Sequence, residues 1–233
     1  MPLPQLNAVP QYELTMPSTG KAHKFRPFLV KEEKVLMIAA ESQEMSQMVN
    51  AIGNIVESCV EGVDKKELSA IDIEYSFLQL RSKSVGETSQ IAIKCEECEA
   101  EIPIDINIQD IKAPNITEKK KKVSLGNNIY INLTMPKYVS MADIDVNPEN
   151  GTEAVFTLIT TCIDSVTTEN EHIKASDVTH KELKDFIESM TNDQFKEIQE
   201  FIQNLPRLKH EIEVTGPCGH VNKTVLEGVQ SFF

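Results

Sequence analysis

Tryptophan is absent from this 233-residue chain, and aromatic residues make up only 6% of it. A hydrophobic core must therefore consist mainly of aliphatic side chains and methionine. No run of apolar residues approaches the roughly eighteen that a membrane-spanning helix needs, so the sequence excludes such a helix. Residues 1–6 (MPLPQL) lack the basic and apolar stretches of a signal peptide. We therefore expect a cytosolic protein that is not secreted.

Positive charge is also scarce. The chain has 23 Lys and Arg residues against 36 Asp and Glu residues, a formal net charge of −13. Such a surface repels a phosphate backbone, because nucleic-acid affinity comes mainly from cationic contacts, and we expect no nucleic-acid partner. It instead favours basic protein partners. The hydrophobic fraction of 40% is typical of a globular protein, and the length allows one large domain or two small ones.

Cysteine spacing points to a metal site. The chain has five cysteines, an odd number, and Cys95 and Cys98 form a C-x-x-C pair. This pattern favours a metal in a reduced compartment over a disulfide framework. A second pair, Cys218 and His220, follows about 120 residues later in a Gly- and Pro-containing turn. Zinc prefers four nitrogen or sulfur ligands. The sequence predicts one structural Zn²⁺ per chain, held by Cys95, Cys98, Cys218 and His220.

Other uses of these residues remain open, namely a metal-free turn or redox chemistry, although the helix start of a thioredoxin-type motif is missing. A catalytic zinc is disfavoured because four protein ligands leave no position for water. His180 and Glu182 match the H-x-E of zinc deaminases, but they follow the C-x-x-C, which has Lys94 where that family has proline. We therefore expect no catalytic residues, no small-molecule cofactor and no enzyme activity. Cys59 and Cys162 are expected to be buried, reduced core residues.

Hydrophobic periodicity predicts an α+β fold, in which helical regions flank a small antiparallel β module with a zinc-ribbon-like knuckle. Isoleucines alternate with other residues on both sides of the cysteine pair, which is a hairpin pattern. Capping-box spacings at Thr179 and Thr191 mark two helix starts. We expect four regions. Residues 1–30 form an extended arm or hairpin, and residues 31–86 form a helical region. Residues 87–135 together with 207–233 form the β module with the zinc site, and residues 136–206 form a second helical region.

Both ends of the chain resemble a known family. The stretches concerned are YELTMPSTG at residues 12–20, KFRPFLVKEEK at 24–34, NDQFKEIQEF at 192–201, LPRLKH at 205–210 and VLEGVQSFF at 225–233. Together they are similar to the baseplate hub assembly proteins of T-even-like contractile-tailed bacteriophages. The resemblance implies a non-enzymatic late tail protein that helps to build the central hub. Its implied partners are other hub proteins or further copies of this chain, in the host cytoplasm during assembly and in the virion tail baseplate.

Two other classes of function remain as alternatives. A zinc-ribbon nucleic-acid adaptor is disfavoured by the acidic balance and the lack of interleaved aromatic and basic residues. A zinc-dependent hydrolase or deaminase is disfavoured by the four-ligand set. The terminal Phe232 and Phe233 should be buried, either in this fold or in a partner. We expect hub proteins to bind the two chain ends, the second of them beside the zinc knuckle.

Overall fold

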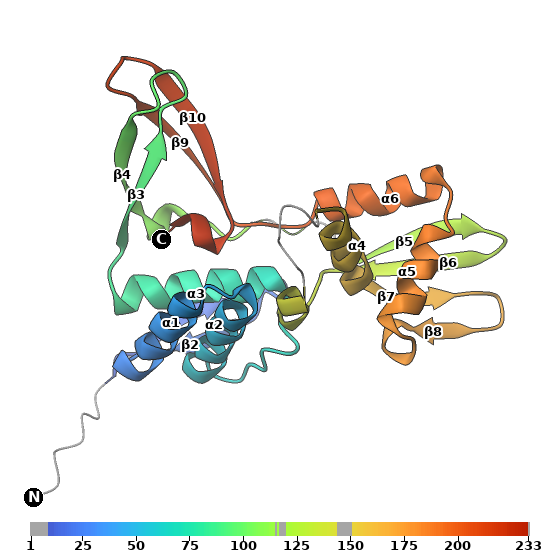
Figure 1. The fold of residues 1–233 in the computed structure, drawn as a ribbon. Coiled ribbons are helices and arrows are strands. Elements are labelled where there is room, and N and C mark those ends of the chain that lie inside the picture. The colour runs from blue at the N-terminus through green and yellow to red at the C-terminus, as the bar shows by residue number, and fades with distance from the viewer. Residues whose placement is uncertain (1–8, 115, 117–119, 144–150, 233) are drawn as a thin grey trace, which may run out of the picture.

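The computed structural model describes residues 9–114, 116, 120–143 and 151–232 (Figure 1). This part of the chain contains six α-helices and ten strands in several small antiparallel sheets, which confirms the α+β class. An N-terminal hairpin precedes a body of three helices. The hairpin strands are β1 (Tyr12–Thr15) and β2 (Ala22–Phe25). The helices are α1 (Val30–Ser42), α2 (Met45–Cys59) and α3 (Ala70–Ser84).

The N-terminal hairpin packs against its own helical body. Leu14 and Phe25 are buried in a cluster with residues of α2 and α3, and the backbone N–H of Arg26 donates to the carbonyl of Cys59 at 3.0 Å. A capping box begins α3. Its Asp72 is buried and accepts hydrogen bonds from the Ser69 hydroxyl at 2.6 Å and from a hairpin N–H at 2.8 Å. The described part of the N-terminal arm is therefore a component of the core, and residues 1–8 lie outside the described residues.

The β module consists of two separate hairpins that lie side by side above α3 (Figure 1). The first hairpin consists of β3 (Thr88–Lys94) and β4 (Glu101–Asn107). The second consists of β9 (Lys209–Thr215) and β10 (Val221–Glu227). Isoleucines alternate along β4 on its more buried face, and Ile106 packs with Ile71 and Leu78 of α3. The cluster beneath the hairpins consists of Ile71, Leu78, Ile106, Ile108, Ile111, Leu208, Leu226 and Phe232.

The C-terminal segment corrects one expectation. Phe232 is fully buried in η5 (Val229–Phe232), and its carbonyl accepts a hydrogen bond from the Ser89 hydroxyl at 2.6 Å. Strand β10 separates this residue from the turn that carries Cys218, and a strand of seven residues carries the chain about 20 Å. The expectation that Phe232 lies beside the knuckle and is free for a partner is therefore wrong. Phe233 lies outside the described residues.

A second α/β unit occupies the middle of the sequence. Its antiparallel sheet has the order β5-β6-β7-β8, with strands Lys120–Gly126, Ile129–Thr134, Ile163–Thr167 and His172–Lys174. Helices α4, α5 and α6 pack on it: Gly151–Cys162, His180–Glu188 and Asn192–Gln203. The capping boxes predicted at Thr179 and Thr191 are present. None of the described helices is long and apolar enough to cross a membrane.

The strand pairing in this unit differs from the grouping that periodicity suggested. The β5–β6 hairpin pairs with β7 and not with the cysteine-bearing hairpins, and residues 163–174 contain strands within a segment expected to be helical. A mostly apolar segment that starts in α4 continues into Ile163, which begins β7 with no turn between them. Local periodicity does not separate a buried helix end from a short strand that follows it at once. The division into four regions stays a proposal.

Candidate metal centre

Two turns from distant parts of the sequence bring three cysteines together. Cys95 and Cys98 belong to the β3–β4 turn, and Cys218 belongs to the β9–β10 turn. Their sulfur atoms all lie within 4.8 Å of one another, and the Sγ atoms of Cys95 and Cys218 are 3.6 Å apart. None of the three forms a disulfide. Three sulfur ligands at this separation could hold a metal ion.

The two turns have related hydrogen bonds. In the first, the N–H of Cys95 donates to Ala100 at 2.9 Å and the N–H of Glu99 donates to the Cys95 carbonyl at 2.9 Å. In the second, Gly216 takes the place of Cys95: its N–H donates to His220 at 2.8 Å, and its carbonyl accepts from Gly219 at 2.9 Å. Gly216 therefore stands at the position in its turn that Cys95 has in the first, and the second turn contributes one sulfur, that of Cys218, to the cluster.

Gly216 also makes space for the cluster. A Cβ atom at this position would lie 2.8 Å from the Cys95 sulfur and 3.5 Å from Ile102. The first distance is shorter than any ordinary contact between these atoms, so a larger residue would push the two turns apart. The sequence had marked Gly216 only as a turn residue. Its close approach to a sulfur 121 positions earlier becomes visible only in the structure.

Asn222 connects the two turns and was missed by the sequence reasoning. This residue is buried. Its side-chain Oδ1 accepts from the N–H of Glu96 at 2.9 Å, and its Nδ2 donates to the Cys95 sulfur at 3.6 Å and to the His220 carbonyl at 3.3 Å. One signal was available, because Asn222 shares its face of β10 with Leu226, and a polar residue at an inward-facing strand position requires partners.

The hydrogen bonds in the turn favour the metal-binding form of Cys95. The backbone N–H groups of Cys98 and Glu97, together with the Asn222 amide, lower the pKa of the Cys95 thiol to about 6. For Cys218, the N–H of His220 lowers the pKa, but the sulfurs of Cys98 and Cys95 outweigh it and raise the pKa overall. The shifts thus favour the thiolate form at Cys95 and the thiol form at Cys218. A bound cation would favour the charged form of both.

The position of His220 leaves its role as fourth ligand a prediction. The cluster of possible ligand atoms includes the three sulfurs and not this imidazole. Nε2 of His220 lies 3.9 Å from a carboxylate oxygen of Glu96, and the ring is half-buried. Because it belongs to the same turn as Cys218, a side-chain rotation is the change that would bring it to a metal.

The surroundings of the cluster bear on the alternative functions. Glu96, Glu97 and Glu99 are exposed around the first turn, and these carboxylates would repel a nucleic-acid backbone. His180, the residue that resembled a deaminase ligand, lies on α5 in the other α/β unit, where its Nδ1 is 3.1 Å from the Thr160 hydroxyl. The structure therefore provides no support for a zinc-ribbon nucleic-acid adaptor or for a deaminase site that includes His180.

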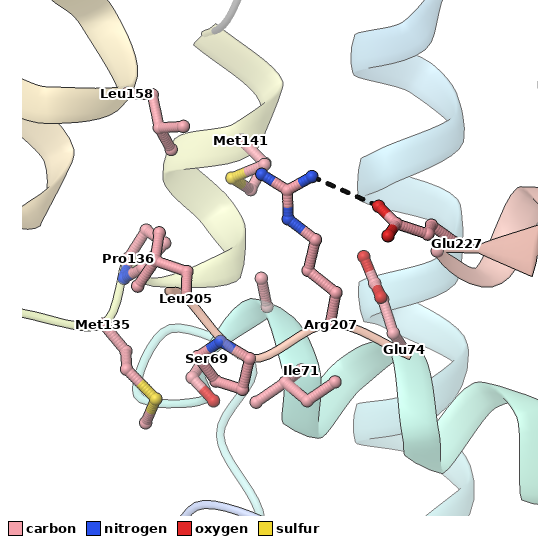
Figure 2. Close-up of a pocket in the computed structure, with 13 residues that line it drawn as sticks. Ser69, Ile71, Glu74, Met135, Pro136, Met141, Leu158, Leu205, Arg207 and Glu227 are labelled. Atoms are coloured by element: carbon pink, nitrogen blue, oxygen red, sulfur yellow. Dashed lines mark hydrogen bonds and ion pairs between the residues drawn. The ribbon is translucent and has the colours of Figure 1, made fainter. Parts of the chain in front are cut away.

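A separate pocket lies where α3 meets the segment that leads into β9. Its volume is about 220 Å³, and Figure 2 shows Glu74 and Arg207 on its wall, with Arg207 joined to Glu227 by an ion pair of 3.4 Å. Burial raises the pKa of the Glu74 carboxyl to about 7, although the nearby Arg207 guanidinium opposes this rise. Burial, with a smaller contribution from the Glu74 charge, also raises the pKa of Tyr138. Glu74 is therefore a largely buried acid whose pKa is raised toward neutral pH.

Comparisons with known proteins agree with the resemblance seen at the chain ends. Residues 9–233 match the family described as T4 bacteriophage base plate protein. The chain is 25% identical over 227 residues to the baseplate hub assembly protein gp26 of Enterobacteria phage T4, covering 96% of this chain and 98% of that protein. No solved structure matches it. Because the family match extends over almost the whole chain, the protein belongs to the T4 bacteriophage base plate protein family.

Proposed function

We propose that this chain is a non-enzymatic protein that takes part in assembling the central hub of a phage tail baseplate through contacts with other hub proteins. The observation that carries the proposal is the family match over residues 9–233. A relative of nearly equal length is named a baseplate hub assembly protein. Partners of this kind, or further copies of the chain, would be met in the host cytoplasm during assembly and in the virion baseplate.

We also propose that the three cysteines and His220 hold one structural Zn²⁺. Thiolate and imidazole ligands suit zinc, and a site closed by four protein ligands contributes to folding and not to catalysis. The two hairpins of the β module pair within themselves and not with each other. A metal shared by their turns would therefore supply a connection that backbone hydrogen bonds do not. Gly216 and Asn222, which fit the two turns around the sulfurs, support this arrangement.

Co-expression with the other hub proteins of the same phage tests the assembly proposal. We expect this chain to co-purify with a hub subcomplex in a fixed ratio, measured as the mass of the intact complex. We also expect the subcomplex to fail to form when the chain is omitted. Hub complexes of unchanged mass and yield without the chain would contradict the proposal. Elemental analysis of the purified chain tests the zinc separately, with about one zinc per chain expected from one ligand set.

A further inference from the structure

The helical body has an open groove bounded by three helices. Its volume is about 590 Å³. Each helix contributes apolar side chains at helical spacing to one wall, and the floor includes Phe28 and Val229. The apolar residues that line it include Leu36 and Met37 of α1, Met45 and Met48 of α2, Phe77 of α3 and Val85, the residue that follows α3. A groove with three helical walls has the shape that accepts a fourth helix.

The walls of this groove are unusually exposed. Met37 is 60% exposed and Val85 is 59% exposed. Helix α1 contains the apolar run of residues 35–40, yet the residues that it buries are Glu32 and Ala39. Small-molecule sites enclose most of their ligand, whereas these wall residues face an open trough. Helices in proteins owe most of their stability to the packing of an apolar face, so the exposed side of α1 is suited to packing against a partner.

The groove continues beside α2 into a second cavity. That cavity, of about 310 Å³, is lined by Met45 and Met48 again and extends to Met141 and Glu74. Methionine side chains are flexible and adapt to the shape of whatever they contact, which makes them common on surfaces that bind protein helices. The apolar surface available to a partner is therefore longer than the groove itself.

Charge indicates what kind of helix would fit. Glu33 on α1 and Glu44 at the start of α2 both line the groove. Among the described residues that line the groove, these two glutamates stand against one arginine, Arg81. A second copy of the chain would bring another net charge of −13 against this surface. A helix with basic residues beside its apolar face is complementary to it.

We propose that this groove docks an amphipathic helix with lysine or arginine flanking its apolar face, supplied by another protein of the hub. This inference rests on the proposed assembly function and names the surface and the chemistry of one partner. Residues at helical spacing on the incoming helix would fill the trough between α1 and α3 and contact the methionines of α2. Its basic flanks would lie near Glu33 and Glu44.

Two synthetic peptides of about 18 residues test the surface directly, a length at which helices form more readily. Both place leucines on one helical face; one has lysines on the other face and the second has glutamates. Fluorescence anisotropy with the full-length chain should show binding of the basic peptide and none of the acidic one. The double variant Met37→Gln, Val85→Gln should weaken binding at least about tenfold, because two apolar contacts are lost.

Matched controls separate the groove from the rest of α1. Ile38 is 54% exposed but does not line the groove, so Ile38→Gln should leave binding unchanged. Glu44→Lys should weaken binding of the basic peptide, whereas Glu41→Lys, at an exposed position of α1 outside the groove, should do so much less. Circular dichroism should show that each variant is folded, as expected for exposed positions.

Several outcomes would overturn the inference. These are equal binding of both peptides, no binding of either, or an equal effect of Ile38→Gln and the groove variant. A wild-type dimer that the groove variant converts to a monomer would make a second copy the occupant. If the wild-type chain and the groove variant both co-purify with the hub, the groove inference fails and the assembly proposal stands. If the wild-type chain does not join the hub, the assembly proposal fails whatever the peptides show.

Discussion

Glu74 offers a quantitative test of the structure. Its carboxyl is buried at the junction between α3 and the segment leading into β9, and burial raises its pKa from 4.5 to about 7. Between these two values the unfolded chain has released the proton while the folded chain still holds it. Stability must therefore fall as pH rises through this window, because the native state binds more protons there. Glu74→Gln, which keeps the shape without the charge, should remove this dependence.

The size of the effect follows from the pKa difference. One pKa unit corresponds to about 1.4 kcal/mol, so the rise from 4.5 to about 7 corresponds to about 3 kcal/mol between pH 4.5 and pH 8. Wild type and Glu74→Gln should have similar free energies of unfolding at pH 4.5. At pH 8 the variant should be more stable by up to about 3 kcal/mol. Urea denaturation followed by circular dichroism at both pH values measures the difference.

The difference between the free energies of unfolding of wild type and variant does not contain the contributions that both proteins share, including those of the other carboxylates. Glu41→Gln, at an exposed position on α1, is the matched control and should show no such pH dependence. If the stability difference between wild type and Glu74→Gln were the same at both pH values, Glu74 would not be the buried acid that the structure shows. If Glu74→Gln were less stable at pH 8, the attraction between Glu74 and Arg207 would outweigh the cost of burial.

Four further predictions concern the metal centre and the core. Cys218→Ser should release the metal and loosen the β module, whereas Cys59→Ser, far from the cluster in the helical core, should retain it by elemental analysis. His220→Ala should weaken zinc binding less than Cys218→Ser does, and an unchanged affinity in a chelator competition would remove His220 from the site. Gly216→Ala should lower the metal affinity, because its Cβ would lie 2.8 Å from the Cys95 sulfur; equal affinity would contradict the close approach. Phe232→Ala should cost about 3–5 kcal/mol of stability in denaturant unfolding, the usual loss for a buried phenylalanine.

Local patterns in the sequence predicted local structure well. The alternating isoleucines around Cys95 and Cys98 form the β3–β4 hairpin, and the capping boxes at Thr179 and Thr191 begin α5 and α6. Each of these features depends on residues within a few positions of one another. The hydrogen bonds and side-chain faces that define them are therefore encoded in a single short segment.

The parts that sequence reasoning missed depend on distant residues. The β5–β6 hairpin could pair with either neighbouring strand system, and its register with β7 is set by a core that includes Ile131 and Ile198. Asn222 reads locally as an ordinary strand residue, although it joins two turns of the metal centre. The raised pKa of Glu74 likewise comes from burial among residues distant in the sequence, such as Met141 and Leu205, that line the same pocket. Contacts between segments that are distant in the sequence leave no periodic pattern in it.

The burial of described residues near both chain ends changes how the partner surface should be mapped. Phe25 from the N-terminal hairpin and Val229 from the C-terminal segment belong to the same hydrophobic cluster, and Phe232 is fully buried in another. Deleting residues 9–28 or 229–233 would therefore remove core side chains, so a loss of hub assembly after such a deletion would report unfolding. Denaturant midpoints of the truncated chains should fall well below that of the full chain. Exposed substitutions such as Met37→Gln leave the core intact, so they can separate binding from folding, whereas truncations cannot. A truncated chain with the wild-type midpoint would contradict this reasoning and return the chain ends to the list of partner sites.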